Sequence, residues 1–150
     1  MVTGTVDVDV QELATFELAL TAEWRSVCTG RHNVLLEGSQ ASTDAVLLLL
    51  RPYLLDPVTW KPSGAPFELH TDKPGALILP GVGALGGAEQ DHLLEWLDDS
   101  HGRTQVVSTT TEPLFSLVAR GLFDETLYYR LNVILLHVDE KNLKGSPTES

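Results

Sequence analysis

The segment that most constrains the fold is the run Gly75-Ala-Leu-Ile-Leu-Pro-Gly-Val-Gly83. Its four apolar residues stand together before Pro80, which is typical of a short strand buried on both faces in the middle of a sheet. Proline has no N–H for a strand ladder and glycine permits a turn, so we expect the strand to end at Pro80. In open parallel α/β sheets ligands bind at this carboxyl end of the strands, where this sequence places proline and glycine instead of charged side chains.

Short apolar runs predict strands, and apolar residues spaced three and four apart predict helices. We expect strands over 34–36, 67–70, 75–79, 105–109 and 131–138, and helices over 10–27, 43–51, 87–97, 114–121 and 123–130. Residues 1–8 fit either an edge strand or a frayed terminus. We interpret 37–44 as a polar loop, 52–64 as a connecting loop, and Asp98-Asp99 as a solvated turn, because acidic residues are unfavourable at a helix C-terminus. The alternation of strands and helices predicts an α/β fold, a three-layer αβα sandwich with a mainly parallel sheet.

Length and charge limit the domain organisation and the partners. The 150 residues suit one domain over 1–140, and residues 141–150 form a polar tail that we expect to be disordered. The single cysteine, Cys28, excludes an internal disulfide framework. The net charge of -11 repels phosphate backbones and anionic membranes, so we expect neither direct nucleic-acid binding nor membrane binding. With no signal peptide and no apolar run of spanning length, we expect a cytoplasmic protein.

Residues 123–134, Phe-Asp-Glu-Thr-Leu-Tyr-Tyr-Arg-Leu-Asn-Val-Ile, resemble the signature that ends the core of the sigma-54 activator AAA+ ATPase domain of bacterial enhancer-binding proteins. The order of the upstream segments agrees. Residues 34–44 stand where that family has its phosphate loop, 67–83 where it has its Walker B strand, and 105–111 where it has its sensor strand. The resemblance covers roughly residues 18–138 and implies a P-loop NTPase or AAA+-like core.

The residues that bind phosphate in that family do not carry over. A phosphate loop needs glycine N–H groups, a lysine and a hydroxyl that holds magnesium. By the resemblance, the phosphate-loop positions of this chain are Gly38, Ala41, Ser42, Thr43 and Asp44. The lysine position is Asp44, whose carboxylate would repel a triphosphate.

The other catalytic positions are changed as well. The acidic pair after the Walker B strand falls on Pro80 and Gly81. Of the two transition-state arginines that the family uses, Arg130 matches one, and Asp124 stands at the other position. The sensor position is Thr111. The polymerase-contacting loop and the helical lid of the family are missing from this sequence, so we expect a core without a lid.

Structural roles account for several of these residues. The hydroxyl residues of 38–43 can cap a helix, and Arg130 can be a surface ion-pair partner. The five histidines lack metal-ligand spacing, so we predict no metal site. Catalytic use of Ser39 or Cys28 is not favoured, because Ser39 lacks the second glycine of a nucleophile elbow and Cys28 has no nearby histidine in sequence.

The leading hypothesis is therefore a non-catalytic sigma-54 activator-like domain, a pseudo-ATPase without a cofactor, that acts as a protein-interaction module in bacterial regulation. Its expected partner is an AAA+ or signalling protein or a second copy of the chain. Candidate contacts are Arg130, Asp124 and Tyr128, and the segments 38–44 and 80–83. Two alternatives stay open: a small-ligand or nucleotide binder (or unusual enzyme) that reuses the strand-end cleft, and a self-assembling structural domain.

Overall fold

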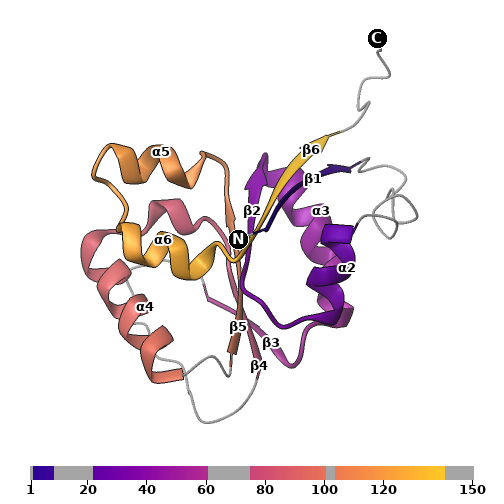
Figure 1. Ribbon diagram of the computed structural model, residues 1–150, viewed down its shortest axis with the longest axis horizontal. Coiled ribbons are helices and arrows are strands. Elements are labelled where there is room, and N and C mark those ends of the chain that lie inside the picture. Colours follow the sequence, from indigo (N-terminus) through magenta and orange to yellow (C-terminus); the bar gives the residue numbers. More distant parts are fainter. Residues whose placement is uncertain (1, 9–21, 61–74, 101–103, 141–150) are drawn as a thin grey trace.

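The computed structural model describes residues 2–8, 22–60, 75–100 and 104–140 (Figure 1). Its strands are β1 (Val2–Val8), β2 (Val34–Gly38), β3 (Pro57–Thr59), β4 (Gly75–Leu79), β5 (Thr104–Thr110) and β6 (Ile134–Glu140). Its α-helices are α2 (Ala22–Thr29), α3 (Gln40–Leu50), α4 (Gly87–Ser100), α5 (Leu114–Ala119) and α6 (Glu125–Leu131). Two 3₁₀ turns, η1 (Arg51–Tyr53) and η2 (Val82–Ala84), follow α3 and β4.

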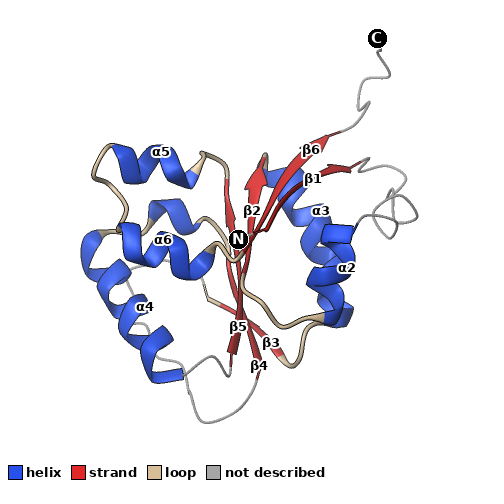
Figure 2. Cartoon of the chain, in the orientation of Figure 1, coloured by secondary structure: helices blue, strands red, loops and turns tan. Residues whose placement is uncertain are grey.

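All six strands form one parallel sheet in the order β1-β6-β2-β5-β4-β3. Helices α2 and α3 cover one face of the sheet, and α4, α5 and α6 cover the other (Figures 1 and 2). The three-layer αβα prediction is confirmed. The chain passes from β2 outward to β3, returns through β4 to β5, and then crosses β2 to reach β6. The order therefore reverses between β2 and β5, which is where open α/β sheets form their binding crevices.

The sheet divides the core into two apolar layers, because successive side chains of a strand point to opposite faces. On β2, Val34 and Leu36 pack toward α2 and α3, whereas Leu35 packs toward α4, α5 and α6. β4 is buried as the sequence predicted and lies between β5 and β3. It ends before Pro80, where the chain turns into η2.

The structure corrects three predictions. Strand β2 extends to Gly38 and α3 begins at Gln40, so most of the predicted polar loop 37–44 is regular structure. Helix α4 continues through Asp98 and Asp99 to Ser100. Asp98 forms a salt bridge with Arg130, which the sequence had suggested as a surface ion-pair partner without naming the acidic residue. Residues 57–59 form the edge strand β3 inside the predicted connecting loop. Pro57 is tolerated there because an edge strand can include a residue without an N–H.

Other predictions fall partly outside the described residues. Residues 1–8 prove to hold an edge strand, β1, which pairs with β6. The predicted helix over 10–27 is described only from Ala22, and it ends at Thr29, two residues later than predicted. The predicted strand 67–70 and the tail 141–150 lie outside the described residues. No helix in the described part of the chain is both long and apolar enough to cross a membrane.

Candidate functional site

The connection between β2 and α3 consists of one residue, Ser39. Its hydroxyl oxygen accepts a hydrogen bond from the backbone N–H of Ser42 at 3.1 Å and lies 2.9 Å from the Ser42 hydroxyl. The Thr43 hydroxyl donates to the Gln40 carbonyl at 3.2 Å. Ser42 and Thr43 are buried, while Asp44 is exposed on the helix. The hydroxyls of this segment therefore cap and brace the first turn of α3, as the capping interpretation predicted.

Gly38 has a structural requirement of its own. It pairs with Val138 across β2 and β6, and a Cβ atom at Gly38 would collide with the Val138 carbonyl oxygen. A glycine at this position is thus explained by the close approach of two strands.

The segment after β4 forms a tight turn. Gly81 is left-handed, with φ of 68°, and its N–H donates to the Thr109 hydroxyl at 3.0 Å. A Cβ at Gly83 would lie 3.0 Å from both Leu117 and Thr110. The turn is held against the end of β5 and the start of the α5 region.

The predicted strand-end segments lie on one edge of the sheet but not side by side. β5 runs between β2 and β4, so Thr110 separates the region of Gly38 from that of Gly81. The predicted sensor residue, Thr111, is exposed just beyond β5. The Thr110 hydroxyl donates to the Glu112 carbonyl at 2.7 Å.

A buried carboxylate that the sequence did not single out lies near this edge. Glu37 is 8% exposed, and its Oε2 accepts a hydrogen bond from the N–H of Leu114 at 3.2 Å. Its Oε1 lies 3.3 Å from Nδ1 of His137 on β6. Glu37 thereby joins the end of β2 to the start of α5. A glutamate beside a glycine at a strand end carries no sequence signal for this contact, because Leu114 lies far along the chain.

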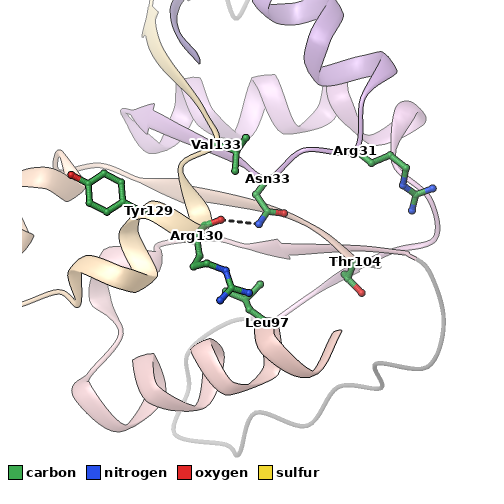
Figure 3. Close-up of a pocket in the computed structure, with 7 residues that line it drawn as sticks. All are labelled: Arg31, Asn33, Leu97, Thr104, Tyr129, Arg130 and Val133. Atoms are coloured by element: carbon green, nitrogen blue, oxygen red, sulfur yellow. Dashed lines mark hydrogen bonds between the residues drawn. The ribbon is translucent and has the colours of Figure 1, made fainter. Parts of the chain in front are cut away.

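Arg130 lies at the opposite edge, near the amino ends of the strands. Its guanidinium forms an ion pair with Asp98 of α4 at 2.5 Å, and its carbonyl accepts from the Asn33 side chain at 2.8 Å. Asn33 also accepts from the N–H of Val106 at 2.8 Å. These groups border an open cleft of about 270 Å³, shown in Figure 3. The cleft is lined by Arg31, Asn33, Leu97, Thr104, Tyr129, Arg130 and Val133.

The other two candidate contact residues have structural roles. Asp124 caps α6 by accepting from the N–H of Leu127 at 2.9 Å. Tyr128 is only 6% exposed and contacts the rings of Phe115 and Tyr129, whose centroids lie 6.1 Å and 5.0 Å away. Burial raises the pKa of Tyr128, so its hydroxyl stays neutral. The neighbouring Tyr129 and Phe115 are the exposed aromatic residues of this surface.

The structure also bears on Cys28 and on the arrangement of metal-binding side chains. Burial raises the pKa of the Cys28 thiol to about 11, which disfavours the reactive thiolate. Among the residues that the structure describes, no group of three or more His, Cys, Asp or Glu side chains is arranged to hold a metal ion.

Comparison with known proteins gives one family. Residues 54–140 match the model of the Sigma-54 interaction domain. The HTH-type transcriptional regulatory protein TyrR of Enterobacter agglomerans is 35% identical over an alignment of 75 residues, and the match covers 43% of this chain and 14% of that protein. TyrR of Salmonella typhimurium is also 35% identical over 75 residues, 15% of its length. The matched part is thus a small share of these regulators.

Solved structures show the same fold. NtrX from Brucella abortus in complex with ADP superposes with a TM-score of 0.65 and 21% identity, covering 85% of this chain and 35% of that chain. The ATP complex of NtrX gives a TM-score of 0.65 at 19% identity, covering 88% of this chain and 36% of that chain.

Proposed function

The chain belongs to the Sigma-54 interaction domain family, whose model spans more than half of it, and we propose that it is a non-catalytic member that acts as a protein-interaction module in bacterial transcription control or signalling. The similarity to transcriptional regulators supports the regulatory setting. Because the matched segment is a small part of those regulators, their other activities are not carried over to this chain.

The observation that carries the proposal is the closed junction between β2 and α3. A phosphate loop binds by wrapping several free backbone N–H groups around phosphate oxygens. Here Ser39 alone separates Gly38 from the helix, which begins at Gln40. The Ser39 hydroxyl accepts a hydrogen bond from the N–H of Ser42. In the first turn of α3, the N–H groups of Ser42 and Thr43 are engaged by the hydroxyl and the carbonyl of Ser39, which supports the proposal that they do not bind phosphate. The exposed carboxylate of Asp44 stands at the position that the resemblance assigns to the phosphate-binding lysine.

The end of β4 supports the same proposal. Catalysis of ATP hydrolysis needs groups that orient magnesium and the attacking water. At this strand end Pro80 and Gly81 have no side chain that could do so, and the Gly81 N–H is engaged by Thr109. Structural contacts at both positions that the resemblance assigns to a nucleotide site support the non-catalytic proposal.

For the interaction surface we propose the cleft beside Arg130 (Figure 3). Arginine and tyrosine are the residues that most often dominate binding energy at protein interfaces. Arg31 and Tyr129 are exposed here, and Arg130 is held in place by Asp98. The two guanidinium groups favour an acidic surface of a partner protein, which can be another regulator or a second copy of this strongly acidic chain.

The first test measures nucleotide binding and hydrolysis by the purified chain. We expect no thermal stabilisation by Mg-ATP or Mg-ADP, whereas a ligand at a hundred times its Kd adds about 2.7 kcal/mol to the free energy of unfolding. We also expect no phosphate release above background. ATP hydrolysis that disappears in Ser42→Ala or Thr43→Ala would refute the non-catalytic proposal.

The second test measures partner capture. Tagged wild-type chain is compared with Arg130→Glu, and with Arg25→Glu as a control for the same charge change at an exposed site on α2. We expect a defined partner protein to be retained by the wild type and Arg25→Glu and lost from Arg130→Glu. Equal retention by all three proteins would show that the Arg130 cleft is not the contact.

A further inference from the structure

A groove lies between the start of α4 and the turn that joins α5 to α6, and its lining includes two of the predicted contact residues, Gly83 and Asp124. It has a volume of about 630 Å³, and two of its lining residues, Gly83 and Leu117, also line a second hollow of about 280 Å³ beside the end of β5. Its apolar lining comes from the buried side chains of Leu85, Leu117 and Phe123 and from the exposed side chain of Leu122. Gly86, Gly87 and Gly121 also line it, and a Cβ built on Gly87 or Gly121 meets no atom within 4 Å.

One buried side chain fixes the two walls of this groove. Gln90 of α4 donates through Nε2 to the carbonyls of Leu85, at 2.9 Å, and Leu122, at 3.0 Å. Its Oε1 accepts from the N–H of Asp124 at 2.8 Å. The amide thus ties the start of α4 to the α5–α6 turn. The groove is held open before any partner arrives, which lowers the entropic cost of binding.

The α5–α6 turn presents an apolar side chain at the groove. The N–H of Gly121 bonds to the Val118 carbonyl at 3.0 Å and the N–H of Leu122 to the Leu117 carbonyl at 2.8 Å, the pattern of a Schellman motif. In such turns the residue at the Leu122 position commonly packs back onto its own helix. Here Leu122 is 58% exposed. Leu122 therefore presents its apolar side chain to solvent beside the groove instead of packing onto α5.

The charges around the groove have one sign. Asp91 and Asp124 line the larger hollow and Glu112 the smaller one, and among the described residues no lysine, arginine or histidine lines either. Glu112 is paired with Arg120, but Asp91 is exposed on α4. The rim therefore favours positive charge in the occupant.

We propose that this groove, residues 81–91 with 110–124, binds a segment of a partner protein in which apolar side chains are flanked by lysine or arginine. The apolar residues contact Leu122, the exposed apolar side chain of the groove, and the cationic groups lie against Asp91 and Asp124. The proposal rests on the interaction-module function and names the chemistry of a second partner surface, opposite in charge to the Arg130 cleft.

The test is a selection of random displayed peptides on the immobilised full chain, followed by fluorescence anisotropy of the enriched peptides. We expect these peptides to combine leucine-like anchors with lysine or arginine. Enrichment of acidic peptides, or no enrichment at all, would overturn the proposal.

Three pairs of variants then locate the binding site. Leu122→Ser removes the exposed contact, and Leu48→Ser is its control, since Leu48 is 69% exposed on α3 at the other face of the sheet. Asp91→Lys reverses a rim charge, and Asp99→Lys makes the same change at the far end of α4. Gly87→Trp fills the groove, and Gly87→Ala leaves it open.

We expect Leu122→Ser, Asp91→Lys and Gly87→Trp each to weaken peptide binding about fivefold or more, the scale of losing one central contact or one complementary charge. The three controls should bind as the wild type does. Equal binding by Gly87→Trp would overturn the groove proposal, as would binding that is lost only in Arg130→Glu. Neither outcome would affect the non-catalytic proposal, which stands or falls on nucleotide hydrolysis. A dimer of the wild-type chain in light scattering that is lost in Gly87→Trp and kept in Gly87→Ala would identify the occupant as a segment of a second copy.

Discussion

Gly38 illustrates how one residue can satisfy a sequence pattern for a different physical reason. By sequence it is the one glycine kept from a phosphate loop. In the structure it allows β2 to approach the Val138 carbonyl on β6. The glycine is therefore required by sheet packing, whether or not a nucleotide binds.

We expect Gly38→Ala to lower the free energy of unfolding by about 2 kcal/mol, because the added methyl group overpacks a strand pair. Urea denaturation measures this change. Gly87→Ala is the control, since its Cβ meets no atom within 4 Å, and it should alter stability by less than about 0.5 kcal/mol. If the two substitutions had equal effects, the close contact at Gly38 would not be what requires glycine.

Cys28 gives a residue-level prediction about pH. Burial raises the pKa of its thiol from 9.0 to about 11, so the folded state holds this proton more tightly than the unfolded chain does. The stabilising contribution is complete below pH 9 and is lost as the pH rises through about 11. Urea denaturation at pH 7, 9 and 11 should show a steeper loss of stability for wild type than for Cys28→Ala. Parallel curves for the two proteins would contradict the raised pKa.

At the level of elements, the sequence predicted the buried strands well and the connections poorly. Strands β2, β4, β5 and β6 are short apolar or β-branched runs, and burial on both faces of a parallel sheet leaves that pattern in the sequence. The start of α3 was missed because Ser39, a cap, looks the same as a loop residue until its partner is known. The end of α4 was missed because acidic residues are unfavourable at a helix C-terminus, and the salt bridge from Arg130 to Asp98 cannot be seen in the sequence.

The candidate site was predictable only in part. Through the family resemblance, the sequence predicted that Asp44, Pro80 and Gly81 stand at positions that have lost phosphate chemistry, and this stays a prediction. It could not identify Glu37 or Gln90, whose roles depend on backbone groups of distant elements. Glutamate and glutamine are usually exposed, so their burial follows from the tertiary arrangement of β2, α4, α5 and α6.

Gln90 gives a testable prediction about the contact between α4 and the α5–α6 turn. Gln90→Met keeps much of the side-chain volume but leaves the Leu85 and Leu122 carbonyls and the Asp124 N–H without this partner. We expect a loss of about 2–3 kcal/mol in unfolding free energy, the cost of leaving buried polar groups unsatisfied. Hydrogen exchange should also accelerate at Asp124. Gln40→Met, at an exposed position of α3, is the control and should be nearly neutral. A neutral effect of Gln90→Met would mean that the α4 and α5–α6 walls hold together without it.

For the whole molecule, the property that most affects stability and partner choice is its net negative charge. A net charge of -11 on 150 residues makes the compact state repel itself, while the acidic groove and the two-arginine cleft concentrate opposite charges at different places. Two partner surfaces of opposite sign suit a module that bridges other proteins. The same imbalance should be measurable in the isolated chain as a dependence of stability on salt.

Raising NaCl from about 0.01 M to about 0.15 M shortens the Debye length from about 30 Å to about 8 Å and so screens long-range repulsion between surface carboxylates. We expect the free energy of unfolding to rise by about 1 kcal/mol, which corresponds to an increase of about 2–4 °C in Tm. Calorimetry measures the shift. The double variant Asp44→Asn, Asp99→Asn removes two exposed charges and should show a smaller salt response. If Tm fell with salt instead, local attractions such as the Arg130–Asp98 pair would outweigh the net repulsion, because salt weakens exposed ion pairs as well.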